Sequence, residues 1–266
     1  RQKAEMRYFI RIAFLGNGFY GTQKQKNHRT VQGDFEEKLS QIFDENIKVI
    51  ISSRLDRNVN ALDFALAFDT EKDTVSPDHL KYYLRRSFLD EVYIKDVRIV
   101  PSSFSPRYDC ENKTYCYLIQ NTEKRNPLLS PISYTPIRLL DIKKVEEVLS
   151  LLEGEHDFSQ FATPEGDENT FLTLDKASVK DVNGMLQIRF TSKAFLRYQV
   201  RFMVGAILSY CDNKLTLSQI RRLLNGEDIK RQKLKVEAKG LYLEHISYPE
   251  IEEKEKTEIS GVLFTL

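Results

Sequence analysis

A short polar segment between two apolar runs carries the side chains best suited to chemistry. There Asp56 stands between Arg54 and Arg57 in a stretch rich in Ser and Asn. The apolar runs 47–51 and 64–68 are rich in β-branched or aromatic residues, which indicates strands on both sides of a loop. Two guanidinium groups favour the ionised form of a carboxylate beside them, and an ionised Asp can act as a nucleophile or a base. Because Ser, Asn and Asp are also common in turns, a solvated turn is the alternative.

Length and composition predict a soluble globular protein. The chain has 266 residues, which suffices for one large or two ordinary domains, and 41% of them are hydrophobic. No apolar run is long enough to span a bilayer, and no secretory signal pattern is visible. The three cysteines and four scattered histidines lack the spacing of a zinc site, and an odd number of cysteines suggests reduced thiols. We therefore expect a cytoplasmic protein without a metal.

Charge is distributed unevenly along the chain, although the formal net charge is only +1. Residues 193–239 hold eleven Lys or Arg against four Asp or Glu, whereas residues 141–175 hold two against ten. This asymmetry fits a protein with one face toward a polyanion, and it fits ordinary solvated helix faces equally well.

The first hundred residues predict a mixed α/β unit. Alternating apolar residues indicate strands over 7–14 and 92–100, in addition to the two that flank Asp56. Amphipathic helices are expected over 30–43 and after Ser76, which is followed by a proline suited to a first helical turn. The resulting β-α-β-β-α-β order resembles a ferredoxin-like unit, in which helices cover an antiparallel sheet.

The second half again mixes strands and helices, after a proline-containing joint at residues 101–106. Strands are expected over 113–120, 172–181, 185–192 and 240–248, and helices over 141–152, over 194–210 and from Thr216 onward. Asn183-Gly184 is a hairpin signal, and Thr216 with Gln219 has the spacing of a capping box. We therefore predict an N-terminal domain over 1–103, a C-terminal domain over 104–249 and a charged tail over 250–266.

The helix predicted over 194–210 carries two arginines and an internal glycine. Arg197, Arg201 and Gly205 are four residues apart and would share one face. Glycine costs about 1 kcal/mol relative to Ala inside a helix, so Gly205 is expected to permit the close approach of another group. The alternative is a surface helix with two solvated arginines.

Together these stretches resemble the TruA family of tRNA pseudouridine synthases, over nearly the whole chain up to residue 249. The catalytic loop of that family usually reads Gly-Arg-Thr-Asp-x-Gly-Val-His-Ala, and residues 53–61 read Ser-Arg-Leu-Asp-Arg-Asn-Val-Asn-Ala. Further similar stretches follow in the family's order: Phe19-Tyr20-Gly21-Thr22-Gln23-Lys24-Gln25, Thr30-Val31-Gln32-Gly33, Phe104-Ser105-Pro106-Arg107, Lys113-Thr114-Tyr115-Cys116-Tyr117, Gly154-x-His156-Asp157-Phe158 and Gly240-Leu241-Tyr242-Leu243. Each stretch is weak alone, but the combination is highly specific.

The resemblance implies roles for individual residues. Asp56 matches the catalytic aspartate that attacks or deprotonates the ribose while uracil is detached, rotated and rejoined through carbon. Tyr115 matches the tyrosine that stacks on the base, and Arg201 matches the basic residue that pairs with the aspartate. Arg54 matches the loop arginine that helps to expel the target uridine from its stack. The residues further implied are Arg57, Arg197, Gln23 and Lys24 for RNA contact or base flipping, and Val59 and Leu243 for the pocket.

The same resemblance implies the architecture and the partners. We expect an α+β fold of two ferredoxin-like or RRM-like domains whose mostly antiparallel sheets meet, with helices on one side and an active-site cleft between the domains. A homodimer, a structured RNA substrate, no metal or organic cofactor and no membrane partner are implied. The leading expectation is isomerisation of a uridine in the tRNA anticodon arm.

Five positions depart from the family's usual residues near the expected catalytic group. They are Thr22 for Trp, Ser53 for Gly, Leu55 for Thr, Asn58 for Gly and Asn60 for His. Because the catalytic groups are retained, these departures bear on the substrate rather than on the chemistry. A ribosomal RNA stem-loop of the 23S type is therefore one alternative substrate. An RNA-binding protein that has lost turnover is another alternative, and a purely structural α+β protein is a third.

Overall fold

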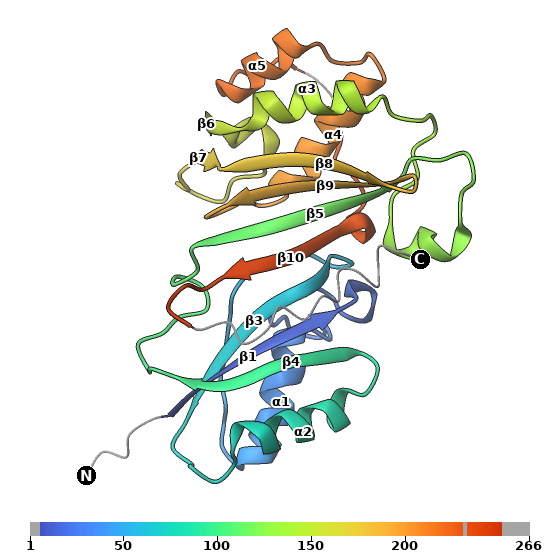
Figure 1. The fold of residues 1–266 in the computed structure, drawn as a ribbon. Coiled ribbons are helices and arrows are strands. Elements are labelled where there is room, and N and C mark those ends of the chain that lie inside the picture. The colour runs from blue at the N-terminus through green and yellow to red at the C-terminus, as the bar shows by residue number, and fades with distance from the viewer. Residues whose placement is uncertain (1–5, 231–232, 252–266) are drawn as a thin grey trace. The chain divides into compact units, whose positions relative to one another are not determined.

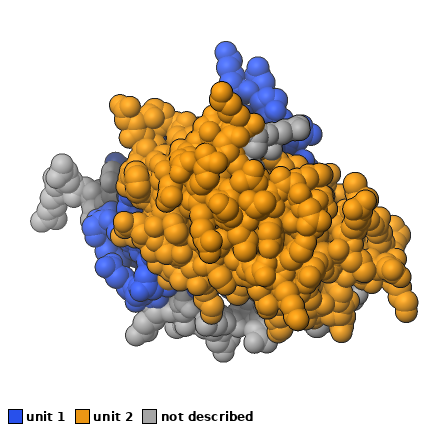
Figure 2. Space-filling view, turned by 90° about the horizontal axis from the view of Figure 1, so that it is seen from above, with its two compact units in different colours: residues 1–111, 243–262 blue, residues 112–242, 263–266 orange. Residues whose placement is uncertain are grey.

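The computed structural model describes residues 6–230 and 233–251 of the chain. These residues fall into two compact units, which Figure 2 marks in separate colours. The first unit is made from both ends of the described chain. Its described residues are 6–111 and 243–251, and those of the second unit are 112–230 and 233–242.

The predicted domains cover residues 1–103 and 104–249, with a tail over 250–266, so the last strand is expected to lie wholly in the second domain. In the compact units this strand is divided, because Tyr242 belongs to the second unit and Leu243 to the first. The predicted charged tail lies outside the described residues from position 252 onward. The predicted domain bounds stay a prediction.

The first unit has the predicted β-α-β-β-α-β order (Figure 1). Its elements are β1 (Met6–Phe14), the short 3₁₀ helix η1 (Gly16–Gly18), α1 (Val31–Phe43), β2 (Val49–Ile51), β3 (Asn60–Thr70), α2 (Pro77–Phe88) and β4 (Val92–Val100). β1 pairs antiparallel with β3 and β4, and β2 pairs antiparallel with β3. β10 (Leu241–Ser247), which enters this unit at Leu243, is a further neighbour of β3. The predicted α+β class with an antiparallel sheet is confirmed.

The two helices of the first unit lie together on one side of its sheet (Figure 1). The ring of Phe35 from α1 stacks on that of Phe88 from α2, with 4.5 Å between the ring centroids. Burial of such a side chain contributes about 1.5–3 kcal/mol. α2 begins at the predicted cap Ser76, and α1 begins one residue after the predicted start at Thr30, which caps it. The hydroxyls of Thr30 and Ser76 each accept a hydrogen bond from the backbone N–H three residues later.

The second unit again mixes strands and helices. Its elements are β5 (Asn112–Gln120), η2 (Pro127–Ile132), α3 (Ile142–Leu152), β6 (Gly154–Asp157), η3 (Phe158–Phe161), β7 (Phe171–Leu174), β8 (Lys176–Val182), β9 (Met185–Ser192), α4 (Gln199–Cys211), α5 (Leu217–Leu224) and η4 (Ala238–Gly240). β9 pairs antiparallel with β5 and β8, whereas β6 and β7 form a separate two-stranded sheet. The predicted hairpin at Asn183-Gly184 joins β8 to β9, and the predicted capping box opens α5 at Thr216.

The single strand predicted over 172–181 is wrong, because the chain forms two strands there. β7 ends at Leu174 and β8 begins at Lys176. β7 pairs with β6, whereas β8 pairs with β9. The chain therefore changes sheets at Asp175, and apolar alternation along the sequence does not reveal which partner each half takes.

The helix predicted over 194–210 begins later than expected. α4 starts at Gln199 because Tyr198 has a left-handed backbone with φ of +63°, which does not continue a right-handed helix. Arg197 consequently lies outside the helix. The prediction that Arg197 and Arg201 share a helix face is wrong for this reason.

Gly205 does permit a close approach, as predicted from its mid-helix position. A Cβ at this position would lie 1.8 Å from the backbone oxygen of Leu234. Most residues of α4 are buried, so the alternative of a solvated surface helix is wrong.

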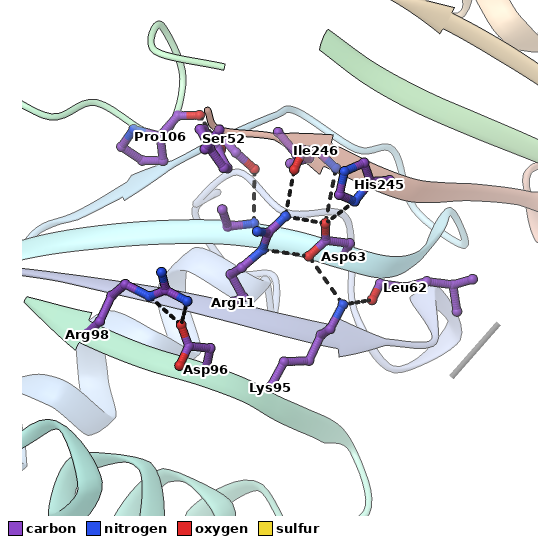
Figure 3. A network of polar contacts seen from close by, with 12 residues as sticks. Arg11, Ser52, Leu62, Asp63, Lys95, Asp96, Arg98, Pro106, His245 and Ile246 are labelled. Atoms are coloured by element: carbon purple, nitrogen blue, oxygen red, sulfur yellow. Dashed lines mark hydrogen bonds and ion pairs between the residues drawn. The ribbon is translucent and has the colours of Figure 1, made fainter. Parts of the chain in front are cut away.

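A buried ion network connects β10 to the sheet of the first unit (Figure 3). The Asp63 side chain on β3 is 2% exposed, and its Oδ1 accepts a hydrogen bond of 2.9 Å from Arg11 Nε on β1. Asp63 Oδ2 also accepts from the backbone N–H of Ile246 at 3.0 Å, and the carbonyl of Ile246 accepts from Arg11 at 2.6 Å. Lys95 and His245 lie 3.3 Å and 3.1 Å from the carboxylate oxygens. The carboxylate thus has partners on three strands.

These partners keep the buried carboxylate ionised. Burial by itself raises the pKa of Asp63, but the hydrogen bond from His245 and the charges of Arg11 and Lys95 outweigh it and hold the pKa well below its usual range. Below about pH 3.9 the unfolded chain takes up this proton, whereas the folded state resists it. The stabilisation is therefore complete above about pH 4 and is lost as the pH falls further.

Replacing the carboxylate by its amide tests this network. We expect Asp63→Asn to lower the free energy of unfolding by about 3–5 kcal/mol at pH 7, because it leaves the guanidinium of Arg11 buried without its counter-charge. The variant should also lose the part of the wild-type acid sensitivity that appears below about pH 4. Denaturant unfolding at pH 7 and pH 3.5 measures both effects.

The matched control is Asp69→Asn. Asp69 pairs with Arg7 on the same two strands, but its side chain is 31% exposed. The control should cost much less than Asp63→Asn, because water can solvate the remaining charge. Equal losses in the two variants would contradict the importance of burial.

Candidate active site

The loop that carries Asp56 spans residues 52–59 and connects β2 to β3, as predicted. Ser52 anchors its start, since the Ser52 N–H donates to Ala65 O at 2.9 Å and the Ser52 hydroxyl accepts from Ala65 N at 3.2 Å. Leu55 and Val59 are 7% and 2% exposed. The loop is therefore held by buried groups at both ends and in its middle, and it is not a freely solvated turn.

Thr22 fixes the middle of this loop from the neighbouring segment. Its side chain is fully buried, and its hydroxyl accepts a hydrogen bond from Leu55 N at 2.8 Å and donates one to Ser53 O at 3.0 Å. The Thr22 backbone N–H also donates to Leu55 O at 3.1 Å. A hydroxyl can donate and accept at once, whereas the indole of the usual Trp only donates. The departure at Thr22 thus has a structural role.

Other departures from the usual loop also have local explanations. Asn58 has a φ of +67°, and Asn is the residue after Gly that best tolerates this left-handed conformation. Asn60 is buried, and its Oδ1 accepts a hydrogen bond from Gly16 N at 2.9 Å. A Cβ on Gly16 would lie 2.2 Å from Val59 O, so the glycine allows this contact. Nothing in the structure explains Ser53.

Asp56 lies at the tip of the loop with its side chain partly exposed. A hydrogen bond of 3.1 Å from Val59 N to Asp56 O closes the turn that sets its backbone. Arg54 and Arg57 on either side are exposed. The loop therefore presents one carboxylate between two cationic side chains, on a backbone fixed by hydrogen bonds.

The guanidinium of Arg57 lies over an aromatic ring of the segment that precedes α1. Its central carbon is 5.1 Å from the centroid of the Tyr20 ring. His28 stacks on the same ring at 3.9 Å, with the ring planes 8° apart. Tyr20 is 38% exposed, so this stack lies at the surface beside the Asp56 loop.

Gln23 and Lys24, which the sequence predicts to contact RNA, are both exposed. Lys24 Nζ forms an ion pair of 2.5 Å with Glu36. Lys24 also lines an open hollow of about 510 Å³. Charged side chains of both signs line this hollow, namely Lys24, Arg29, Asp34, Glu36, Glu37 and Lys48. The mixture of charges makes the hollow a poor receptor for a polyanion.

The second unit contains the predicted Tyr115 and Arg201. Tyr115 on β5 is 8% exposed, and its ring meets Phe195 edge to face at 5.0 Å. Arg201 in the first turn of α4 is partly exposed, and its Nε donates to Val236 O at 2.8 Å. Arg197, just before α4, pairs with Glu165 at 2.8 Å.

The structure places the predicted site residues in both units. The first unit holds Asp56, Arg54, Arg57, Val59, Gln23, Lys24 and Leu243, and the second holds Tyr115, Arg197 and Arg201. Asp56, its two arginines and Val59 share one loop, whereas Leu243 lies fully buried on β10. The pairing of Asp56 with Arg201 stays a prediction.

Sequence reasoning missed three residues with evident contacts. Thr22 stands out in the sequence only as a departure from Trp, which gives no sign of its hydrogen bonds. Tyr198 directly follows Arg197, and an aromatic residue beside a cation is a signal that was available. Lys235 is distant in sequence from both, and no local pattern indicates that it lies over the Tyr198 ring at 3.9 Å.

Residues 6–230 and 233–251 contain neither a cluster of metal ligands nor a membrane-spanning helix. In that part of the chain, no three or more His, Cys, Asp or Glu side chains gather as a metal ion would require. The described helices include none that combines the length and apolar character needed to cross a bilayer. Cys110, Cys116 and Cys211 are not joined in disulfide bonds.

A family model and known proteins from several bacteria match the sequence. The model, described as tRNA pseudouridine synthase, matches residues 148–249. The tRNA pseudouridine synthase A of Aquifex aeolicus (strain VF5) is 35% identical over 239 residues, which cover 90% of this chain and 98% of that one. The enzyme of the same name from Malacoplasma penetrans (strain HF-2) is 34% identical and covers 91% and 100%. That from Staphylococcus aureus (strain JH1) is 31% identical and covers 93% and 92%.

Removal of the Thr22 hydroxyl should loosen the Asp56 loop. We expect Thr22→Val to lower the free energy of unfolding by about 1–3 kcal/mol, because the N–H of Leu55 is left buried without an acceptor. Amide hydrogen exchange of Leu55 should become faster than in the wild type. Thr22→Ser keeps the hydroxyl and serves as the control, which should retain slow exchange at Leu55. Unchanged exchange in the Val variant would show that the loop does not depend on this contact.

Proposed function

Because the chain belongs to the tRNA pseudouridine synthase A family, we propose that it isomerises uridine to pseudouridine in the anticodon arm of tRNA. Identities of 31–35% over at least nine-tenths of the chain establish the family. The chain is accordingly an RNA pseudouridine synthase that acts on tRNA. The anticodon arm and the roles of individual residues are the proposal.

The reaction is balanced without any co-reactant. The bond between ribose C1′ and uracil N1 breaks, the base turns, and a new bond joins C1′ to C5. The hydrogen on C5 leaves as a proton, and N1 gains one. In the proposed mechanism Asp56 attacks or deprotonates the ribose while the base is detached.

The main support for this proposal is that hydrogen bonds hold the backbone that carries Asp56. Its loop resembles the family's catalytic loop, and hydrogen bonds with Thr22 and from Val59 N set the backbone on both sides of the carboxylate. A nucleophile or base held in this way loses little entropy when the substrate binds. The exposed Arg54 and Arg57 flank it where RNA phosphates or an unstacked base would approach.

The remaining roles concern the target nucleotide. An enzyme that acts on a base within structured RNA must take the base out of its stack, and an aromatic face with an inserted side chain offsets part of that cost. We assign the aromatic face to Tyr115 and the inserted side chain to Arg54. Arg201 would pair with Asp56 and keep it ionised. The other assignments are Val59 and Leu243 to the apolar pocket, and Arg57, Arg197, Gln23 and Lys24 to RNA contact.

Asp56→Asn tests the central role with minimal change in shape. We expect the rate of pseudouridine formation in a tRNA transcript to fall by at least about 10²-fold, because a positioned catalytic group contributes that much or more. Asp44→Asn is the matched control, since the Asp44 side chain is fully exposed and pairs only loosely with Lys72 at 3.5 Å. The control should keep the wild-type rate. Full activity of Asp56→Asn would overturn the mechanism.

Chemical mapping of pseudouridine in cellular RNA tests the substrate. Cells that lack the gene should lack pseudouridine in the anticodon arm, and the wild-type gene but not Asp56→Asn should restore it. Loss at a tRNA uridine outside that arm, or in ribosomal RNA alone, would contradict the proposed target. RNA binding without any missing pseudouridine would indicate a protein that has no turnover.

We also propose that the enzyme is a homodimer, which the family resemblance supports. Sedimentation equilibrium at micromolar concentration should give a mass near twice the 31.1 kDa of one chain. A mass of one chain under these conditions would refute the dimer.

A further inference from the structure

Three cationic side chains gather around one aromatic ring at the start of α4. The charged groups of Arg197, Arg201 and Lys235 lie 4.8 Å, 5.5 Å and 3.9 Å from the centroid of the Tyr198 ring. Arg197 also donates a hydrogen bond of 2.9 Å to the Tyr198 hydroxyl. We call these four residues the Tyr198 cluster. All of them belong to the second unit.

Backbone contacts place Lys235 in this cluster. The segment from Leu234 to Val236 lies directly against α4, where the absence of a Cβ on Gly205 leaves room for Leu234 O. On the other side of Lys235, Val236 O accepts a hydrogen bond from Arg201 Nε at 2.8 Å, and Val236 N donates to Arg201 O at 3.4 Å. The position of Lys235 over the ring is therefore set on both sides by main-chain packing.

The cluster concentrates positive charge at an accessible place. Lys235 is exposed, and Arg197 pairs with the half-exposed carboxylate of Glu165 at 2.8 Å. A cation over an aromatic face gains about 0.5–1 kcal/mol at an exposed site, which offsets part of the repulsion between neighbouring cations. Such an arrangement is favoured further when a polyanion binds, because the cations then replace counterions condensed on the phosphate groups.

We propose that Arg197 and Lys235 of the Tyr198 cluster bind backbone phosphates of the RNA substrate, with Tyr198 as the residue that positions these two cations. This inference rests on the proposed function, since it assumes an RNA substrate. Stacking of a base on Tyr198 is disfavoured, because Lys235 at 3.9 Å already occupies a face of the ring. A phosphate diester can instead bind the cations without displacing them.

The salt dependence of tRNA binding tests the cluster. Removal of one phosphate-binding cation should reduce the slope of log K against log salt by about 0.7–0.9. We therefore expect Lys235→Gln to weaken binding of a tRNA transcript by about 5–8-fold at 0.1 M salt and to flatten the slope by that amount. Lys214→Gln, which removes one exposed charge beyond the other end of α4, is the matched control and should keep the wild-type slope.

The role of the ring itself is tested by two neutral substitutions. Tyr198→Leu should flatten the slope although it removes no charge, because the cations then have no aromatic face to hold them together. Tyr198→Phe keeps that face and should keep most of the slope. Equal thermal unfolding midpoints would confirm that these variants remain folded. Wild-type slopes for both Lys235→Gln and Tyr198→Leu would overturn the proposal.

The outcomes separate this inference from the proposed function. If Asp56→Asn abolishes turnover while the cluster variants bind tRNA as the wild type does, only the cluster is refuted. If the wild type forms no pseudouridine in any tRNA but the cluster variants show the expected slopes, the function is refuted and the phosphate site stands. Inorganic phosphate added at constant ionic strength should not displace tRNA, because a single free phosphate releases few counterions.

Discussion

The stability of the first unit depends on a buried carboxylate whose charge must stay paired. Asp63 is held by Arg11 from β1 and by the backbone of Ile246 from β10. An unpaired charge in such a place costs several kcal/mol, so the C-terminal strand is part of the N-terminal unit's stability. The loop that carries Asp56 leads directly into β3, the strand that also carries Asp63. The same strand thus supports both the buried network and the candidate active site.

Main-chain contacts fix the positions of the two segments to which we assign RNA contacts. In the first unit, Thr22 bonds to the backbone on both sides of Arg54. In the second, the segment that carries Lys235 packs against Gly205 of α4. Long cationic side chains are flexible, but a rigid backbone beneath them limits where their charges can lie. Backbone fixation of this kind positions an enzyme for a large, charged substrate without the need for many surface ion pairs.

Elements whose signals are local could be predicted from the sequence. Apolar periodicity indicated the order of the first unit, Thr30 and Ser76 indicated helix starts, and Asn183-Gly184 indicated the hairpin. The start of α4 could not be predicted, because a left-handed Tyr198 leaves the apolar spacing around it unchanged. Asp63 was missed for a related reason, since its partners come from distant strands. Family resemblance indicated Asp56, whereas the contacts of Thr22 required the structure.

The division of the first unit between both ends of the chain has a consequence during synthesis. Arg11 and Ile246 are 235 positions apart. At roughly 5–20 residues per second, the ribosome takes on the order of 10–50 s to make the intervening chain. Throughout that time β3 lacks its neighbour β10, and an apolar strand with open hydrogen-bonding groups is prone to pair with other chains. During this interval the unpaired edge of β3 in the nascent protein is available both to chaperones and to incorrect pairing with other chains.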